Sequence, residues 1–176
     1  MKLYNTLSGQ KEEFTPIGDS VKLYVCGITP YAPSHLGHAM SCVIFDVLRR
    51  YLEFKGYQVH HVQNFTDIDD KIIQQAARLE ISTAELAERY IEEYLEDMAT
   101  LNVSNAHVYP RATHEVPNII EIIETLIDKG YAYVAKGDVY FRVHKAEGYG
   151  KLSRRTLDGM VSSDDLEMET DKEHPG

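Results

Sequence analysis

Two strand-like stretches on either side of one long apolar segment constrain the fold of this chain most strongly. Residues 21–26 and 57–65 alternate apolar with polar side chains, which is typical of β-strands. Residues 39–55 contain neither Gly nor Pro and are dense in large apolar side chains, which predicts a largely buried helix ended by Gly56. A strand, a helix and a strand joined by short loops form a βαβ unit. We therefore predict an α/β fold with a parallel sheet and a right-handed crossover.

Later segments predict further helices and one hairpin. Apolar residues spaced by three and four predict helices from about Thr83 and over residues 119–127. Residues 131–134 and 139–143 predict the two strands of a hairpin. From Val161 onward the chain is strongly acidic and has no aromatic residue, so we expect a flexible segment there.

Acidic residues after the second strand fit the start of a helix. Thr66 or Asp67 can cap a helix whose first turn carries Asp69 and Asp70, where carboxylates interact favourably with the helix dipole. We favour this role for the acids over a magnesium site.

Composition limits the classes of function open to this chain. Its 176 residues carry a net charge of -10, which excludes nucleic-acid binding driven by an overall positive charge. No apolar run approaches the roughly 20 residues that cross a bilayer, and the first residues form no apolar signal core, so we expect neither a membrane partner nor secretion. Two cysteines without a CxxC pair exclude a disulfide scaffold and a self-contained zinc knuckle, and they fit a cytoplasmic protein.

The loop after the first strand carries the residues with the most chemistry. In open α/β sheets, ligands bind beyond the carboxyl ends of the strands, beside helix N-termini that attract phosphate. His35 and His38 stand there with Gly37 between them, and Cys26 ends the strand. Because Gly37 has no Cβ, a flat base or ribose can approach the backbone. The pattern predicts a nucleotide site with a thiolate on its rim.

Each of these features alone has a simpler explanation. A pair of histidines in a loop is often incidental, and a lone Cys such as Cys26 or Cys42 is usually a small buried apolar residue. Structural zinc needs four ligands, of which Cys26 supplies only one. His60 and His61 are adjacent in a strand, so they point to opposite faces and cannot share a metal.

In combination, the motifs resemble the cysteinyl-tRNA synthetase family. His35 to His38 is similar to the His-Ile-Gly-His signature of class I synthetases, with Leu36 in place of Ile. The resemblance covers the whole chain, through residues 5–7, 24–31, 35–38, 45–52, 64–71, 110–114 and 149–153.

The resemblance implies an enzyme that activates cysteine with ATP to cysteinyl-adenylate and transfers it to tRNA-Cys. His35 and His38 would be catalytic residues that contact the ATP phosphates and stabilise charge on the leaving pyrophosphate. Gly37 would lie under the adenosine, and Thr29 would help to bind ATP. Mg²⁺ would accompany the nucleotide.

The resemblance also implies where the substrate L-cysteine binds. Cys26, Gly27 and Thr66 would face it, and Cys26 corresponds to the family's first zinc ligand. One Zn²⁺ in the complete protein would bind the substrate sulfur directly. A thiolate is a strong zinc ligand and a serine hydroxyl a poor one, so the metal would select cysteine.

Domain boundaries follow from the same resemblance. Residues 1–110 would form the first half of a Rossmann-type (HUP-like) catalytic domain, residues 111–160 the start of a connective insertion, and residues 161–176 an acidic flexible segment. The other zinc ligands and the Lys-Met-Ser-Lys-Ser loop would lie beyond Gly176. We therefore expect an N-terminal fragment that is inactive alone and that self-associates through its exposed sheet surface. Residues 151–155 look superficially like that lysine loop, but they fall in the expected insertion and we do not assign them to it.

Three alternatives stay open. A cysteine-activating ligase of mycothiol biosynthesis has the same fold, although residues 69–72 and 110–114 look more like the synthetase. A small nucleotidyltransferase shares the His-x-Gly-His loop but has no need for Cys26. A synthetase-derived chain can also serve as a binding module without catalysis.

Overall fold

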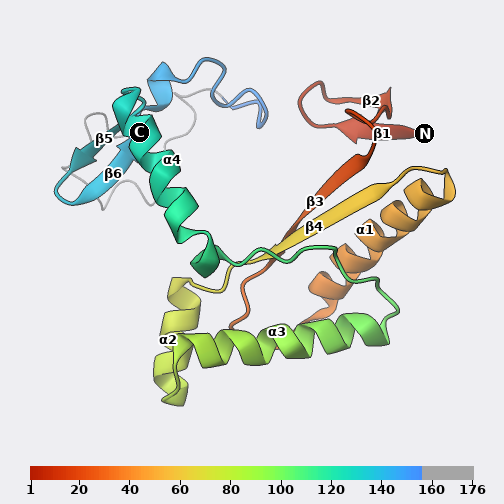
Figure 1. Ribbon diagram of the computed structural model, residues 1–176, viewed down its shortest axis with the longest axis horizontal. Helices are drawn as coiled ribbons and strands as arrows, with labels where there is room; N and C mark the ends of the chain where they lie inside the picture. The colour runs from red at the N-terminus through yellow and green to blue at the C-terminus, as the bar shows by residue number, and fades with distance from the viewer. Residues whose placement is uncertain (156–176) are drawn as a thin grey trace. The chain divides into compact units, whose positions relative to one another are not determined.

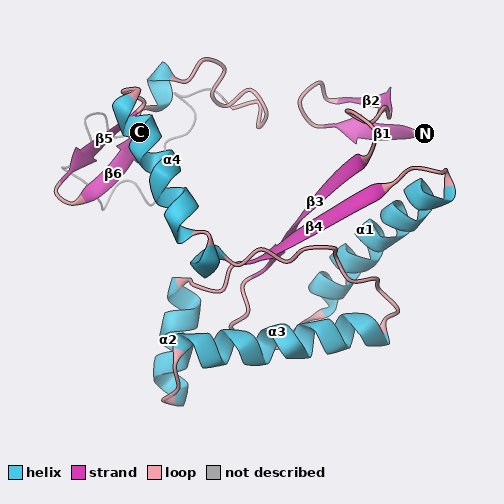
Figure 2. Cartoon of the chain, viewed as in Figure 1, coloured by secondary structure: helices cyan, strands magenta, loops and turns pink. Residues whose placement is uncertain are grey.

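The computed structural model describes residues 1–155, which form helices and short strands in an α/β arrangement (Figure 1). The chain divides into two compact units. One comprises residues 16–116, and the other comprises residues 1–15 together with the chain from Pro117. Figure 2 shows that the unit of residues 16–116 contains the paired strands β3 and β4 and the helices α1, α2 and α3. The predicted α/β class is confirmed.

The predicted βαβ unit is present in residues 16–116. Strands β3 (Val21–Ile28) and β4 (Val59–Phe65) pair in parallel, with Val21 opposite Val59. Helix α1 (Leu36–Phe54) connects them. It begins three residues before the predicted start, because a side chain at residue 35 caps it.

A third extended segment lies along the other edge of β4. The Gln63 N–H donates to the Val108 carbonyl at 3.1 Å, and the Phe65 N–H donates to the Pro110 carbonyl at 2.8 Å. The bridges between β4 and residues 108–111 are parallel, so three parallel stretches end at one edge of the sheet. The sequence analysis did not predict this third stretch.

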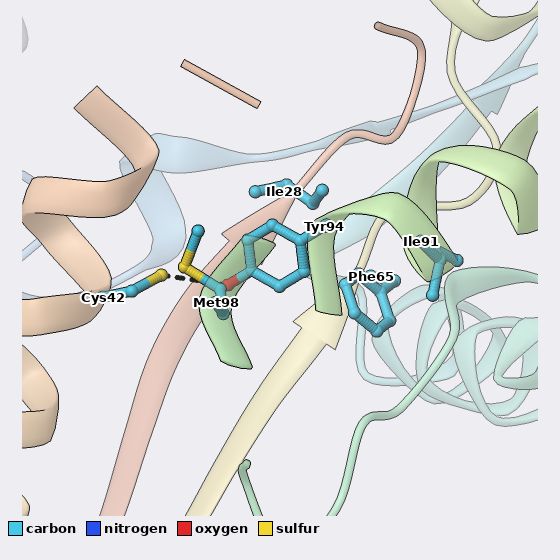
Figure 3. Close-up of a cluster of buried hydrophobic side chains, with 6 residues drawn as sticks. All are labelled: Ile28, Cys42, Phe65, Ile91, Tyr94 and Met98. Atoms are coloured by element: carbon cyan, nitrogen blue, oxygen red, sulfur yellow. Dashed lines mark hydrogen bonds between the residues drawn. The ribbon is translucent and has the colours of Figure 1, made fainter. Parts of the chain in front are cut away.

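One buried cluster joins the sheet to α1 and to α3 (Thr83–Thr100). Figure 3 shows its six side chains, contributed by β3, β4 and both helices: Ile28, Cys42, Phe65, Ile91, Tyr94 and Met98. The Cys42 Sγ lies 3.0 Å from the Tyr94 hydroxyl, and the Phe65 ring meets the Tyr94 ring edge-on. Burial, with the Cys42 contact second, raises the pKa of Tyr94 well above its usual range. The packing role predicted for Cys42 is confirmed.

Helix α1 is less buried than predicted. Its buried residues are Cys42, Asp46 and Leu52, whereas Ile44 is 57% exposed and Val47 is 59% exposed. Within the described residues, the sheet and α3 cover only one side of the helix. The expectation of a largely buried helix was therefore wrong.

The start of α2 (Asp70–Leu79) also corrects the prediction. Asp69 is the N-cap, and its side chain accepts the Lys71 N–H at 2.9 Å. Asp67 is buried and instead accepts the N–H of Thr113 at 2.9 Å and its hydroxyl at 2.5 Å. Neither Thr66 nor Asp67 caps the helix, because the Asp67 carboxylate is already engaged at the edge of the sheet.

Up to residue 155, the other unit contains two hairpins and one α-helix. Strands β1 (Lys2–Asn5) and β2 (Gln10–Glu13) pair antiparallel, and the sequence analysis did not predict them. The helix predicted over residues 119–127 is α4 (Val116–Asp128). Strands β5 (Ala132–Ala135) and β6 (Asp138–Phe141) form the predicted hairpin.

The turn residues of the β5–β6 hairpin explain why the sequence predicts a hairpin there. Lys136 and Gly137 both have positive φ, 50° and 97°, the combination that a tight two-residue hairpin turn requires.

The acidic segment predicted after Val161 lies outside the described residues. In the described part of the chain, no helix has the length and apolar character that a bilayer crossing would need.

A buried carboxylate fastens the chain after α3 to α1. Asp46 is 8% exposed and accepts the Ser104 N–H at 3.0 Å and the Arg50 Nε–H at 2.6 Å. Arg50 also donates to the Asn102 carbonyl at 2.8 Å. Burial raises the pKa of Asp46, but the hydrogen bonds from Arg50 and Ser104 outweigh it and leave the pKa lowered. This contact holds residues 102–104 where the third stretch can follow β4.

We predict that Asp46→Ala destabilises the fold by about 2 kcal/mol, because it removes a buried carboxylate and leaves part-buried donors without an acceptor. Glu53→Ala on the same helix, which removes the exposed carboxylate that pairs with Arg49, should cost less than about 1 kcal/mol. Urea denaturation measures both free energies of unfolding. A lowered pKa means that the stabilisation is present above the ordinary Asp pKa and is lost as pH falls through the folded value. The difference between Asp46→Ala and the unsubstituted chain should therefore shrink below about pH 4, and a difference that stays constant there would contradict this assignment.

Candidate functional site

Two histidines build the N-terminus of α1. His35 is the N-cap, with an extended backbone at φ -129° and ψ 171°, and its Nδ1 accepts the Gly37 N–H at 3.1 Å. The His38 Nδ1 in turn accepts the His35 N–H at 3.3 Å. The two rings stack at 3.8 Å between centroids. Together they form a reciprocal capping box, a device that usually uses a hydroxyl and a carboxylate or amide.

This cap determines which ring nitrogens carry protons. In each histidine the Nδ1 is an acceptor, so the neutral imidazole carries its hydrogen on Nε2. Burial, and secondarily the proximity of His35, lowers the pKa of His38 and favours the same neutral form. The start of α1 therefore offers two Nε2–H donors beside the positive end of the helix dipole. That is a suitable arrangement for an anionic ligand.

Gly37 has a packing role that the sequence analysis did not foresee. A Cβ at this position would lie 3.0 Å from the His35 ring, closer than nearly all real Cβ contacts. The residue is exposed, which agrees with the expected approach of a base or ribose. Its missing side chain thus leaves room for the His35 cap as well.

The predicted amino-acid residues lie where β3 and β4 end. The register between the strands shifts between Val25 and Ile28, so Cys26 and Gly27 form an irregularity in β3. The Cys26 thiol is free and exposed, not sealed in the core. The Thr66 N–H donates to the Ile28 carbonyl at 3.0 Å, which continues the pairing past the end of β4. Cys26, Gly27 and Thr66 therefore stand on adjoining strand ends.

Only glycine fits at position 27. A Cβ there would lie 1.6 Å from the Asn64 carbonyl oxygen, a backbone atom that cannot move aside. The Gly27 N–H donates to the Asn64 Oδ1 at 2.9 Å. Asn64 was not singled out from the sequence.

The two predicted groups are joined by the loop of residues 29–34. Thr29 opens this loop, and its carbonyl accepts the Tyr31 N–H at 3.0 Å. The Lys71 ammonium lies over the Tyr31 ring, 5.4 Å from its centroid, and connects the loop to the first turn of α2. We call Cys26, Gly27 and Thr66 the strand-end group. Within residues 1–155, no hydrogen bond links His35 or His38 directly to this group.

A pocket lies beyond the end of the third stretch. The Arg111 guanidinium pairs with the Glu88 carboxylate through both of its terminal nitrogens. Asp67, Thr113 and His114 line the same pocket. The sequence analysis left Arg111 and His114 without a role, and the structure shows that Arg111 is committed to an ion pair.

The histidines of β4 behave as predicted. His61 is buried on the core side at 6% exposure, whereas His60 is exposed and its ring stacks on His107. Within the described part of the chain, no three His, Cys, Asp or Glu side chains gather closely enough to hold a metal ion. The exposed Cys26 could contribute one thiolate to a metal site. The described residues supply no complete ligand set for it.

A helix N-terminus beside the carboxyl ends of parallel strands is the arrangement of a Rossmann-type α/β fold, in which ligands usually bind at that edge of the sheet. The comparison with known families is specific. Residues 13–176 match the family described as "tRNA synthetases class I (C) catalytic domain". The chain belongs to this family of class I synthetase catalytic domains.

Several similar curated proteins share a name. The chain is 58% identical over 176 residues to a protein named "Cysteine--tRNA ligase" from Dehalococcoides mccartyi (strain ATCC BAA-2100). That alignment covers 99% of this chain and 38% of the relative. A protein of the same name from Moorella thermoacetica is 51% identical, with 99% and 37% covered. The chain thus spans little more than a third of the length of these relatives.

Solved structures agree on the fold. A methionyl-tRNA synthetase of Mycobacterium tuberculosis in complex with methionyl-adenylate superposes with a TM-score of 0.58 at 24% identity, covering 65% of this chain and 24% of that one. A second structure of the same enzyme gives a TM-score of 0.56 at 26% identity over 64% of this chain and 23% of that one.

We predict that His38 titrates with a pKa below that of the same residue in the urea-unfolded chain. Protonation would place a hydrogen on Nδ1 and break the bond from the His35 N–H. A lowered pKa means that its stabilisation of the helix start is present above the ordinary His pKa and is lost as pH falls through the folded value. NMR titration of the His38 Cε1 proton in both states measures the difference. An equal or higher folded pKa would refute the capping box.

Proposed function

We propose that this chain is the ATP- and cysteine-binding part of a cysteine–tRNA ligase. The complete protein would form cysteinyl-adenylate from L-cysteine and ATP and then charge tRNA-Cys. The observation that carries the proposal is the pair of imidazoles that caps α1 through Nδ1 in a chain of the class I synthetase family. The names of the relatives at up to 58% identity support cysteine as the amino acid.

The helix start would bind the triphosphate. Nε2–H groups of His35 and His38 would donate to phosphate oxygens and to the charge that builds on the leaving pyrophosphate. A preorganised donor of this kind is worth about 3 kcal/mol in the transition state. Gly37 would lie against the adenosine, and Thr29 would contribute to the same pocket. Mg²⁺ would arrive with ATP as part of the substrate.

The strand ends would bind the amino acid. Cys26, Gly27 and Thr66 adjoin one another, and the Cys26 thiol is exposed. Cys26 would be one ligand of a zinc ion, with its other ligands outside the described residues. When bound, zinc would select cysteine by holding its sulfur, since thiolate is the preferred ligand.

Domain organisation and self-association belong to the same proposal. Residues 1–110 would be the first half of the catalytic domain, residues 111–160 the start of the connective insertion, and residues 161–176 a separate acidic segment. The exposed apolar residues of α1, among them Met40, Ile44 and Val47, support self-association of the chain on its own.

We predict that His35→Asn weakens ATP binding about tenfold or more, because the shorter Asn side chain cannot place a donor where the His35 Nε2–H would meet a phosphate oxygen. Asn is an equally good N-cap, so the thermal unfolding midpoint should stay close to that of the unsubstituted chain. His35→Ala should lose both affinity and stability. His60→Asn, at the opposite end of β4, is the matched control and should retain both. Calorimetry with ATP and with a non-hydrolysable cysteinyl-adenylate analogue gives the affinities, and a chain that ignores both ligands would be a binding module without catalysis.

We further predict that the 176-residue chain alone supports no cysteine-dependent pyrophosphate exchange. A chimera in which it replaces the matching 38% of the Dehalococcoides mccartyi relative should exchange, bind zinc and charge tRNA-Cys. Cys26→Ser in the chimera should lower both the zinc content and the rate, because one thiolate ligand is lost. Robust exchange by the chain alone, or transfer of cysteine by the chimera to glucosaminyl-inositol in preference to tRNA, would overturn this assignment.

A further inference from the structure

Asn64 contacts both sides of the strand-end group. Its Oδ1 accepts the Gly27 N–H at 2.9 Å, and its Nδ2 donates to the Thr66 hydroxyl at 3.3 Å. The side chain is half-buried. A single amide therefore connects the irregular end of β3 with the first residue after β4.

The hydrogen bond to Gly27 replaces a missing ladder contact. Parallel pairing is regular up to Val25 and resumes only where Ile28 faces Phe65. An irregularity of this kind leaves an N–H group without a strand partner, and a half-buried N–H group needs an acceptor. The Asn64 side chain supplies it.

This contact also constrains Cys26. The peptide bond between Cys26 and Gly27 is planar, so fixing the Gly27 N–H fixes the direction of the Cys26 carbonyl as well. The backbone torsion that carries the exposed Cys26 thiol is then held from the neighbouring strand.

The second hydrogen bond orients the Thr66 hydroxyl. A hydroxyl has one donor and two acceptor positions, and Asn64 occupies one acceptor position. The remaining acceptor position and the hydroxyl proton stay available to a ligand, and their directions are set by the bond to Asn64.

We propose that Asn64 is a positioning residue for the amino-acid half of the site. It acts through Gly27 and Thr66, touches no phosphate-binding residue, and therefore governs affinity for the cysteinyl moiety and not for ATP. This inference rests on the proposed function, because cysteine is the ligand that Cys26 and Thr66 would hold.

The test compares two ligands on the 176-residue chain by calorimetry. Asn64→Ala should bind the cysteinyl-adenylate analogue about tenfold more weakly, whereas ATP affinity should change by less than about twofold. Hydrogen exchange of the Gly27 amide should become about tenfold faster. Val62→Ala, on the same strand, is the control: it removes packing but no bond to Gly27 or Thr66, and both affinities should persist.

A double substitution tests whether Asn64 acts through Thr66. If it does, Asn64→Ala combined with Thr66→Val should weaken analogue binding by less than the product of the two single effects. Asn64→Gln keeps the amide but displaces it by one methylene, so it should also lose analogue affinity while it retains ATP affinity. This variant keeps the proposal testable if Asn64→Ala does not fold.

The outcomes separate this inference from the proposed function. Unchanged analogue affinity in Asn64→Ala or Asn64→Gln overturns the role of Asn64 and leaves the proposed function standing. Equal losses for ATP and for the analogue also overturn it, because they indicate general destabilisation. If the unsubstituted chain binds neither ligand, the proposed function fails, and the assignment of Asn64 to a cysteine site fails with it.

Discussion

Parallel pairing of β3 and β4 is the constraint on which the rest of the site depends. Parallel strands need a crossover, and α1 provides it by leaving the carboxyl end of β3 and returning to the start of β4. The N-terminus of α1 must then begin beside the strand ends. Cys26 and Thr66, which are far apart in the sequence, become neighbours for the same reason. Backbone topology thus assembles a helix dipole, two imidazoles and a thiol before any ligand is present.

The two histidines at the helix start have more than one role. An ordinary N-cap would satisfy the orphan N–H groups of the first turn equally well with Ser or Asp. Imidazoles do so through Nδ1 and still retain an Nε2–H each. An Asp at this position would repel the proposed triphosphate, whereas an imidazole that accepts through Nδ1 would present a donor to it. Under the proposed function, the chemistry of the cap and the chemistry of the ligand would favour the same residue type.

The elements that the sequence predicted are those with a local signal. The βαβ unit follows from alternation and apolar density, and the β5–β6 hairpin follows from a Lys-Gly turn that needs positive φ. Strands β1 and β2 were not predicted from the sequence, because their side chains are almost all exposed and show no apolar alternation. The stretch at residues 108–111 was not predicted because it pairs with β4 through isolated bridges and does not form a regular strand. Asn64 escaped because Asn is unusual in strands, and its role depends on an irregularity that appears only once the strands pair. The cap of α2 was misplaced because Asp67 binds Thr113, a partner distant in the sequence.

Side chains continue the sheet where its backbone ladder ends. Asn64 connects β3 with the chain that follows β4, and Asp67 connects the chain after β4 with Thr113 after the third stretch. Each link pairs a side-chain oxygen with a backbone N–H that the regular ladder does not reach. A strand end that only frays cannot hold a ligand in one geometry, whereas ends tied by short, partly buried hydrogen bonds remain open to a ligand and stay ordered. Under the proposed function, the same two links would let residues outside the helix-start motif determine the shape of the amino-acid side of the site.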